Sequence, residues 1–301
     1  MSATAPARRL PPWLKVRPPS GAGYERIKGL LADSPLHTVC EEARCPNVAE
    51  CWGGGTATFM VMGDTCTRGC RFCSVATALL PAPPDPAEPA RLAEALARLS
   101  LAYAVVTTVC RDDLPDQGAA HVAACVAAAK ARCPGTLLEF LAQDFRGDEA
   151  LLKKVVDAGP DVLSHNLETV ERLTHPVRDA KAGYRQSLAV LAAAKRLRPS
   201  LATKSSLMLG LGEKEDELRA AFRDLRAVGV DILTLGQYLR PTSSPHHLPV
   251  AEFVPPERFE ELGALAKSMG FLYVASGPFV RSSYRAGELF LEGMLRERRP
   301  S

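Results

Sequence analysis

Three cysteines within eight residues are the first feature of this sequence that could do chemistry. The stretch "CTRGCRFC", residues 66–73, places Cys66, Cys70 and Cys73 at intervals of four and three, directly after an apolar run. The ordinary alternative is a structural zinc site, which usually takes four protein ligands, often in two paired halves. Here three thiols share one loop that has no histidine and no fourth cysteine. Clustered thiolates favour an iron–sulfur cluster, and three ligands on four irons leave one iron open for a substrate.

A second cysteine triplet lies a little upstream. The stretch "CEEARCPNVAEC", residues 40–51, carries Cys40, Cys45 and Cys51 at intervals of five and six. These intervals put the thiols on no common helical face, and Pro46 interrupts any helix. A loop wrapped around a compact metal centre accommodates this spacing, so a second iron–sulfur cluster is favoured. The alternative is a zinc site that borrows a distant fourth ligand.

Regularly alternating elements must position these loops. Short apolar runs predict strands at 56–63, 103–108, 136–142, 162–168, 203–211 and 231–239, and amphipathic stretches predict helices at 86–99, 119–131, 148–157, 183–197, 214–228 and 256–269. This alternation predicts a parallel sheet built from right-handed βαβ units. Because the chemically interesting residues follow strand ends, we expect an α/β fold, a partial (β/α)6 TIM-type barrel. Residues 56–270 would form that barrel, with 1–55 as an N-terminal and 271–301 as a C-terminal extension.

Composition and charge exclude several partners. Among 301 residues, 37 Lys and Arg against 34 Asp and Glu give a net charge of +3, which implies no nucleic acid. No apolar run approaches the ~18 to 20 residues of a membrane helix, so no membrane partner is expected. The basic N-terminal stretch is rich in proline and lacks an apolar signal core. Nine cysteines, an odd number, argue against a disulfide scaffold, and we expect a cytoplasmic protein.

The cysteine motifs resemble those of a known superfamily. The CxxxCxxC spacing with Phe72 before the last cysteine resembles the radical S-adenosylmethionine (SAM) superfamily. Both triplets together resemble the lipoyl synthase family, as do further blocks in that family's order, including "VVTTVCRDDLPDQGAAH", "HNLETVERL", "TKSSLMLGLGE", "DILTLGQYLRPT" and "VASGPFVRSSYRAGE". Two positions depart from the family pattern. Ser206 replaces an expected glycine and Gly287 a common acidic residue, and neither is a predicted ligand.

The resemblance implies an enzyme with two [4Fe–4S] clusters and SAM as co-substrate. Cys66, Cys70 and Cys73 would hold the cluster that cleaves SAM to methionine and a 5′-deoxyadenosyl radical. An auxiliary cluster would supply the sulfur atoms, held by Cys40, Cys45, Cys51 and Ser283, the second serine of "VRSSYRAGE". The implied reaction inserts sulfur at the sixth and eighth carbons of an octanoyl chain. That chain would be carried on a lysine of a lipoyl carrier domain or glycine-cleavage H protein.

Further partners and supporting residues follow from the same resemblance. A flavodoxin- or ferredoxin-type reductant and an iron–sulfur cluster repair protein are implied. Phe72, Asn166 and Glu168 are expected at the SAM site, although "HNLETV" could also be a capped strand–helix turn. Arg281 or Arg285 is expected to stabilise negative charge at the serine ligand.

Several other polar residues have ordinary interpretations. Asp112 and Asp113 either position SAM or cap a loop. His246 and His247 are expected to be exposed loop residues rather than substrate contacts. The remaining cysteines, Cys110, Cys125 and Cys133, are expected to be structural.

Other functions remain as alternatives. Another sulfur-inserting radical SAM protein, such as a methylthiotransferase, would need an added nucleic-acid-binding domain, for which the chain has no room. A two-cluster electron carrier has no use for a six-unit barrel. A zinc-stabilised binding module would be colourless, and iron content separates it from the favoured interpretation.

Overall fold

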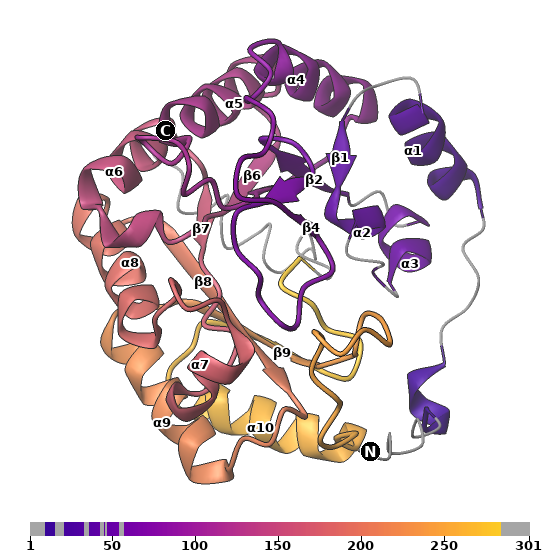
Figure 1. Cartoon of the computed structure of the whole chain (residues 1–301), viewed down its shortest axis with the longest axis vertical. Coiled ribbons are helices and arrows are strands. Elements are labelled where there is room, and N and C mark those ends of the chain that lie inside the picture. The colour runs from indigo at the N-terminus through magenta and orange to yellow at the C-terminus, as the bar shows by residue number, and fades with distance from the viewer. Residues whose placement is uncertain are drawn as a thin grey trace.

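One mostly parallel sheet organises the chain. The computed structural model describes residues 10–15, 21–32, 36–42, 45, 47–53 and 57–283. Its main sheet has eight strands in the order β1-β2-β5-β6-β7-β8-β9-β10, and the two edge strands do not pair with each other (Figure 1). The six predicted strands are all present and parallel: β2 (Thr58–Val61), β5 (Tyr103–Thr108), β6 (Leu137–Leu141), β7 (Val162–Ser164), β8 (Ala202–Leu209) and β9 (Ile232–Gln237).

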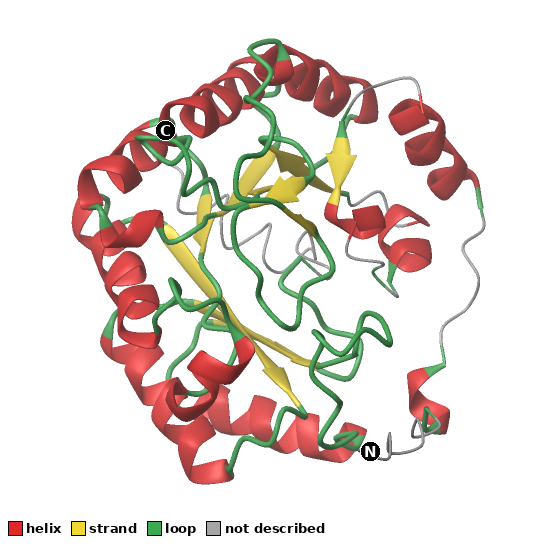
Figure 2. Cartoon of the chain, viewed as in Figure 1, coloured by secondary structure: helices red, strands yellow, loops and turns green. Residues whose placement is uncertain are grey.

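Helices cover the outer face of this sheet (Figure 2). One long helix follows each of the six predicted strands: α4 (Glu88–Leu99), α5 (Ala119–Arg132), α6 (Glu149–Asp157), α8 (Tyr184–Leu197), α9 (Glu215–Ala227) and α10 (Pro256–Ser268). Their apolar faces pack inward, as Leu92 and Leu96 of α4 do, and Cys125 of α5 is fully buried as expected. The partial TIM-type barrel is therefore confirmed. Within the described residues, no helix has the length and apolar character that crossing a membrane requires.

Segments outside the predicted barrel extend its sheet at both edges. The strand β10 (Tyr273–Ser276) pairs in parallel with β9, and β1 (His37–Thr38) pairs antiparallel with β2. Neither strand was predicted. The remaining elements are short or peripheral: η1 (Pro12–Leu14), α1 (Ala22–Ala32), α2 (Val39–Glu42), α3 (Val48–Gly53), β3 (Thr65–Cys66), β4 (Ala76–Thr77), η2 (Phe145–Gly147), η3 (Glu171–Leu173) and α7 (Thr174–Val177). Tyr24 of α1 stacks on buried Trp52 of α3, with ring centroids 5.2 Å apart.

A buried ion pair joins two strands of the barrel. Lys204 of β8 contacts Glu139 of β6 at 2.9 Å, and both side chains are almost fully buried. The hydroxyls of Tyr103 and Ser164 donate to the same carboxylate at 2.7 and 2.5 Å. A buried carboxylate is tolerated because all these donors compensate it.

Removal of the cation tests this arrangement. Lys204→Met leaves Glu139 buried without its counter-charge, and we expect the free energy of unfolding to fall by about 3–5 kcal/mol. Lys153→Met is the matched control because Lys153 pairs with Asp157 at the surface, where a pair contributes under about 1 kcal/mol. Anaerobic urea unfolding of both variants measures the difference. Equal losses would show that the interior pair contributes no more than a surface pair.

Candidate metal centre

A cavity of about 880 Å³ lies at the carboxyl ends of the parallel strands. This is the end at which barrel enzymes carry their sites. Its wall includes all six cysteines of the two triplets together with Phe72, Asn166, Glu168, Arg281 and Ser283. Arg285 lies outside the described residues. The structure thus brings together, around one cavity, every described residue that the sequence singled out for the site.

The thiols are arranged for something larger than a single ion. All nine cysteines are described and none forms a disulfide. In the described part of the chain, two groups hold three potential ligand atoms within 4.8 Å of one another: Glu88, His121 and Cys125, and His37, Glu42 and Asp64. Neither contains a complete cysteine triplet. Thiolates on one tetrahedral zinc lie about 3.8 Å apart, so wider triplets around a large cavity fit a polynuclear cluster better.

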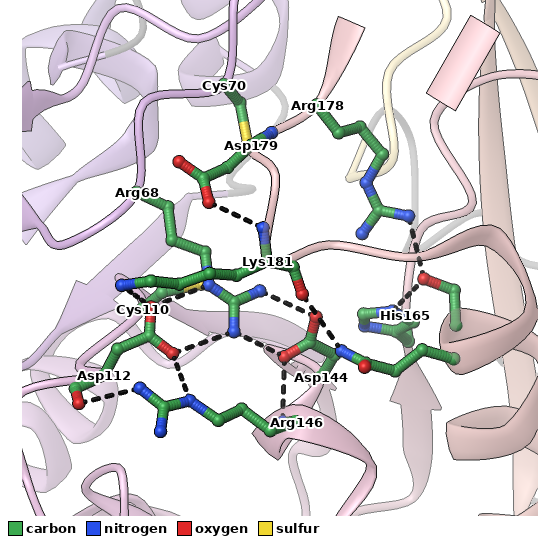
Figure 3. Close-up of polar contacts among 12 residues, drawn as sticks. Arg68, Cys70, Cys110, Asp112, Asp144, Arg146, His165, Arg178, Asp179 and Lys181 are labelled. Carbon is green, nitrogen blue, oxygen red and sulfur yellow. Dashed lines mark hydrogen bonds and ion pairs between the residues drawn. The ribbon is translucent and has the colours of Figure 1, made fainter. Parts of the chain in front are cut away.

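A buried arginine fixes the loop that carries Cys66, Cys70 and Cys73. The guanidinium of Arg68 donates to Asp112 at 2.9 and 3.0 Å and to Asp144 at 2.6 and 2.8 Å (Figure 3). Burial disfavours the charged forms, but these bonds outweigh it. They hold the pKa of Asp112 well below its usual range and raise the pKa of Arg68.

The two aspartates whose role the sequence left open are both engaged in ion pairs. Asp112 also pairs with Arg146 at 3.0 Å and Lys181 at 3.4 Å, so it supports the cysteine loop. Asp113 pairs with buried Arg111 at 2.8 Å. A third carboxylate, Asp179, accepts the backbone N–H of Gly69 at 2.9 Å.

A second loop, which contains His246 and His247, is hydrogen-bonded to the same cysteine loop. His247 is buried, and its Nε2 lies 2.9 Å from the carbonyl oxygen of Cys73, to which it donates while Nδ1 accepts from Thr242 at 2.8 Å. Arg71 Nε donates to the carbonyl of His246 at 3.0 Å. The expectation of an exposed loop pair holds for His246 and is wrong for His247, because a contact 174 positions away in the sequence buries it.

The thiols of this loop differ in their electrostatic surroundings. A hydrogen bond with the Cys110 thiol, which outweighs burial, is the main cause that lowers the pKa of Cys66 to about 6. Burial raises the pKa of Cys70 to about 11 and that of Cys73 to about 12. Metal binding would therefore displace protons from the last two thiols at neutral pH.

Two buried acceptors on the cavity wall lack partners. Asn166 Nδ2 donates to Glu168 Oε1 at 3.1 Å, while Asn166 Oδ1 has no hydrogen-bond partner in the described structure. Gln143 Nε2 donates to the carbonyl of Gln117, and its Oε1 is likewise unpaired. Since buried polar atoms are normally satisfied, these two oxygens indicate a ligand that carries hydroxyl or amino donors. Gln143 belongs to no recognisable motif, and nothing in its sequence context indicates this role.

Glu168 occupies a constrained position beside them. Its φ of 69° lies in the left-handed region, which non-glycine residues rarely adopt. The backbone is held there by β8, because Glu168 N–H donates to Ser206 O and Met208 N–H donates to Glu168 O, both at 2.9 Å. Burial raises the pKa of its carboxyl group. Strain of this kind is typical of positions that serve a ligand.

The second triplet lies where the two flanking segments of the chain meet. Asn47, between Cys45 and Cys51, donates to the carbonyl of Phe279 at 2.5 Å. Ser74, next to Cys73, donates to the carbonyl of Glu42 at 2.8 Å, which links this region to the first loop. Burial raises the pKa of Cys40 to about 11. Burial also raises the pKa of Cys45, and the charge of Arg281 partly offsets that shift.

A glycine of β9 makes room for residues 280–283, which contain Ser283 and are called the serine segment below. A Cβ added to Gly236 would lie 1.8 Å from the carbonyl oxygen of Val280 and 3.2 Å from the Arg281 guanidinium. The backbone of residues 280–283 therefore enters the cavity directly across this strand end. A larger residue at this position would force the segment away from the cysteines.

Comparisons with known proteins identify the class of enzyme. The profile of the radical SAM superfamily matches residues 60–225. Among solved structures, methylornithine synthase has a TM-score of 0.55 at 13% identity, with 91% of this chain and 92% of that chain covered. The hydrogenase maturase HydG has a TM-score of 0.57 at 15% identity, with 81% and 62% covered. At such identities these likenesses show the fold alone, whereas the profile places the chain among radical SAM enzymes.

Sequence relatives narrow this class to one family. The profile described as the N-terminal domain of lipoyl synthase matches residues 2–45. A lipoyl synthase of Anaeromyxobacter sp. is 60% identical over 97% of this chain and 98% of its own length. One from Thermus thermophilus is 55% identical over 96% and 89%, and a mitochondrial one from Aedes aegypti is 55% identical over 96% and 75%. The chain belongs to the lipoyl synthase family, as its two cysteine triplets predicted.

The glycine at the strand end provides a test of the serine segment. Gly236→Ala should displace residues 280–283 while the barrel stays folded, and product formation should fall by about 10²-fold, as ångström-scale misplacement typically costs. Gly277→Ala is the matched control because its added Cβ would meet the side chain of Val280, rather than its carbonyl group, at an ordinary 3.5 Å. Anaerobic product assays and circular dichroism compare the two. Equal activity would show that the segment need not approach β9.

Proposed function

We propose that this chain forms lipoyl groups with two [4Fe–4S] clusters bound around one cavity. Cys66, Cys70 and Cys73 would bind the cluster that works with SAM, and the other triplet would bind the sulfur-donating cluster. The observation that carries this proposal is that both triplets and Ser283 line a single cavity of about 880 Å³. A radical formed at one cluster must reach a carbon that the other cluster can also reach, and a shared cavity allows this.

The residues beside the first loop suit a SAM site. When bound, the reduced cluster supplies the electron that cleaves SAM, and the resulting radical removes hydrogen from unactivated carbon. Asn166 Oδ1 and Gln143 Oε1 would accept hydrogen bonds from the hydroxyl and amino groups of SAM. Phe72 lies half-buried on the same wall of the cavity and would pack against the bound SAM.

The serine segment suits a cluster that must be dismantled. We assign Ser283 as the fourth ligand of the auxiliary cluster because it lines the cavity with Cys40, Cys45 and Cys51. An alkoxide oxygen is a harder ligand than a thiolate and suits iron in a sulfide-rich cluster less well. It could therefore leave as sulfur is given up. Arg281, which lies close enough to Cys45 to affect its pKa, would balance the charge.

The cavity wall also suits the acyl substrate. Apolar side chains contribute to it from several strand ends and loops, including Met60, Leu141, Leu207, Val250 and Phe253. The substrate we propose is an octanoyl-lysine on a lipoyl carrier domain or H protein. A flavodoxin- or ferredoxin-type protein would reduce the SAM cluster, and a repair protein would rebuild the auxiliary one. The reducing cytoplasm would keep the nine cysteines out of disulfides.

Two cysteine variants test the division of labour. Cys70→Ala should abolish SAM cleavage, since it removes a ligand of the cluster that binds SAM. Cys45→Ala should leave SAM cleavage measurable and stop sulfur insertion. Iron content, methionine release and lipoyl product are measured on anaerobically purified protein, in which two clusters correspond to about eight irons per chain. Undiminished lipoyl yield from Cys45→Ala would contradict the sulfur-donor role.

The serine assignment has a separate test. Ser283→Cys should keep both clusters and SAM cleavage but impair sulfur transfer, because a thiolate holds that iron more firmly than an alkoxide. Ser282→Cys is the control, since it places the same thiol one residue away. Quenched product assays on Ser283→Cys, Ser283→Ala, Ser282→Cys and the unmodified protein provide the measurement. Full lipoyl formation by Ser283→Cys and Ser283→Ala alike would exclude Ser283 as a ligand.

A further inference from the structure

Two loops without acidic residues meet at one edge of the cavity. The loop that follows β9 is hydrogen-bonded to the loop that carries the first cysteine triplet, and the two lie side by side (Figure 1). Residues 239–250 and 66–78 contain no aspartate and no glutamate. The first of these loops contributes Arg240, Pro249 and Val250 to the cavity wall. Positive charge on these loops can therefore be neutralised only by groups from elsewhere.

The arginines at this edge donate to neutral acceptors. Arg240 is exposed, and its Nη2 donates to the carbonyls of Ser243 and Ser244 at 3.2 and 2.7 Å. Arg71 is half-buried, and its Nε donates to the carbonyl of His246 at 3.0 Å. Neither guanidinium forms an ion pair with a carboxylate among the residues that the structure describes. Two cationic groups are thus fixed in place without a counter-charge.

The contacts of these two side chains leave donors available for a ligand. Exposed arginines on the outer helices, such as Arg172 and Arg185, each pair with a glutamate. In contrast, Nε and Nη1 of Arg240 and Nη2 of Arg71 donate to no described group. A guanidinium is planar and presents its N–H groups in a rigid fork that matches a carboxylate. Because the loop carbonyls fix both planes, a carboxylate partner finds its donors already oriented.

We propose that Arg71 and Arg240 form the docking surface for the carrier protein and bind carboxylate side chains that flank its octanoyl-lysine. The inference rests on the proposed function for the identity of this substrate. The acyl chain must enter the cavity while the folded carrier stays outside, so the carrier surface meets the cavity edge. Arg240 is both exposed and part of the cavity wall, which is the position that such a contact requires.

Peptide binding to the full-length, two-cluster protein tests this proposal. Three labelled peptides carry a central lysine: octanoylated with Asp and Glu flanks, octanoylated with Asn and Gln flanks, and not octanoylated with the acidic flanks. Anaerobic fluorescence anisotropy gives each Kd. The parent protein should bind the acidic octanoyl peptide about fivefold more tightly than the neutral one, which is the upper end for an exposed ion pair. Arg240→Gln should remove this preference, and Arg240→Lys should recover part of it.

A matched variant controls for net charge. Arg196 pairs with Glu149 on the outer helices, so Arg196→Gln removes one positive charge away from the cavity edge and should keep the preference. Arg71→Gln should lose it, with iron content measured in parallel because Arg71 lies inside the cysteine loop. High salt should weaken the preference of the parent protein, since exposed charges are screened.

The outcomes separate docking from the proposed function. Retention of the preference in Arg240→Gln would overturn the docking role. An equal loss of affinity for both octanoyl peptides would also overturn it, because Arg240 would then only hold its loop in place. If the parent protein binds the acidic peptide equally well with and without the octanoyl group, the proposed substrate is wrong, whatever the flanks contribute.

A charge reversal distinguishes recognition from a structural role of Arg240. Arg240→Glu should bind an octanoyl peptide with lysine flanks more tightly than the parent protein does, because the new carboxylate attracts the reversed charges. A structural role predicts weaker binding of every peptide. No gain in affinity for the lysine-flanked peptide would therefore contradict the proposal.

Discussion

The site depends first on the buried contact of Arg68 with Asp112 and Asp144. Burying one cation and two carboxylates is costly, and such groups are no evidence of stability by themselves. What the arrangement provides is geometry, because the planar guanidinium makes four hydrogen bonds in fixed directions. It ties a loop without regular structure to the ends of β5 and β6. Three ligands can be held at cluster spacing only if that loop has one conformation.

The need to hold ligands in one conformation also explains the role of the two segments that precede and follow the barrel. The barrel alone offers one triplet, and the second comes from residues that precede β2. Contacts with other parts of the chain must position these residues. Asn47 makes one such contact, a hydrogen bond to the carbonyl of Phe279, 232 positions away in the sequence. The segment that contains Phe279 passes over Gly236 to reach the cavity. The proposed auxiliary site is therefore assembled from the two ends of the chain, on the rim of a barrel that already holds the first triplet.

Some of this could be predicted from the sequence, and the reason is that the signals are local. Cysteine spacing lies within one loop, and alternating apolar runs lie within one strand or helix, so both triplets and the six strand–helix units could be recognised. The strand β10, buried His247 and unpaired Gln143 Oε1 could not. The first two owe their character to a residue far along the chain: β10 to its pairing with β9, and His247 to the carbonyl of Cys73. Gln143 Oε1 is recognised by the absence of a partner in the described structure, which no sequence pattern records. The role of Asp112 was left open for the same reason, because its partner Arg68 lies 44 positions away.

The surroundings of the two triplets differ in a way that matches two different fates for their clusters. Around Cys66, two backbone N–H donors converge on the sulfur and a buried ion network fixes the loop, so the cluster we propose there would have its charge stabilised and its ligands firmly held. A centre that must cycle between two charge states needs both properties. Burial raises the pKa of thiols at both triplets, so the difference between them lies in the contacts around Cys66 and in the fourth ligand we propose for the second triplet. The nearest oxygen ligand we propose there, Ser283, is a weaker one for iron. A cluster held in this way is easier to take apart, which is the property that a source of sulfur requires.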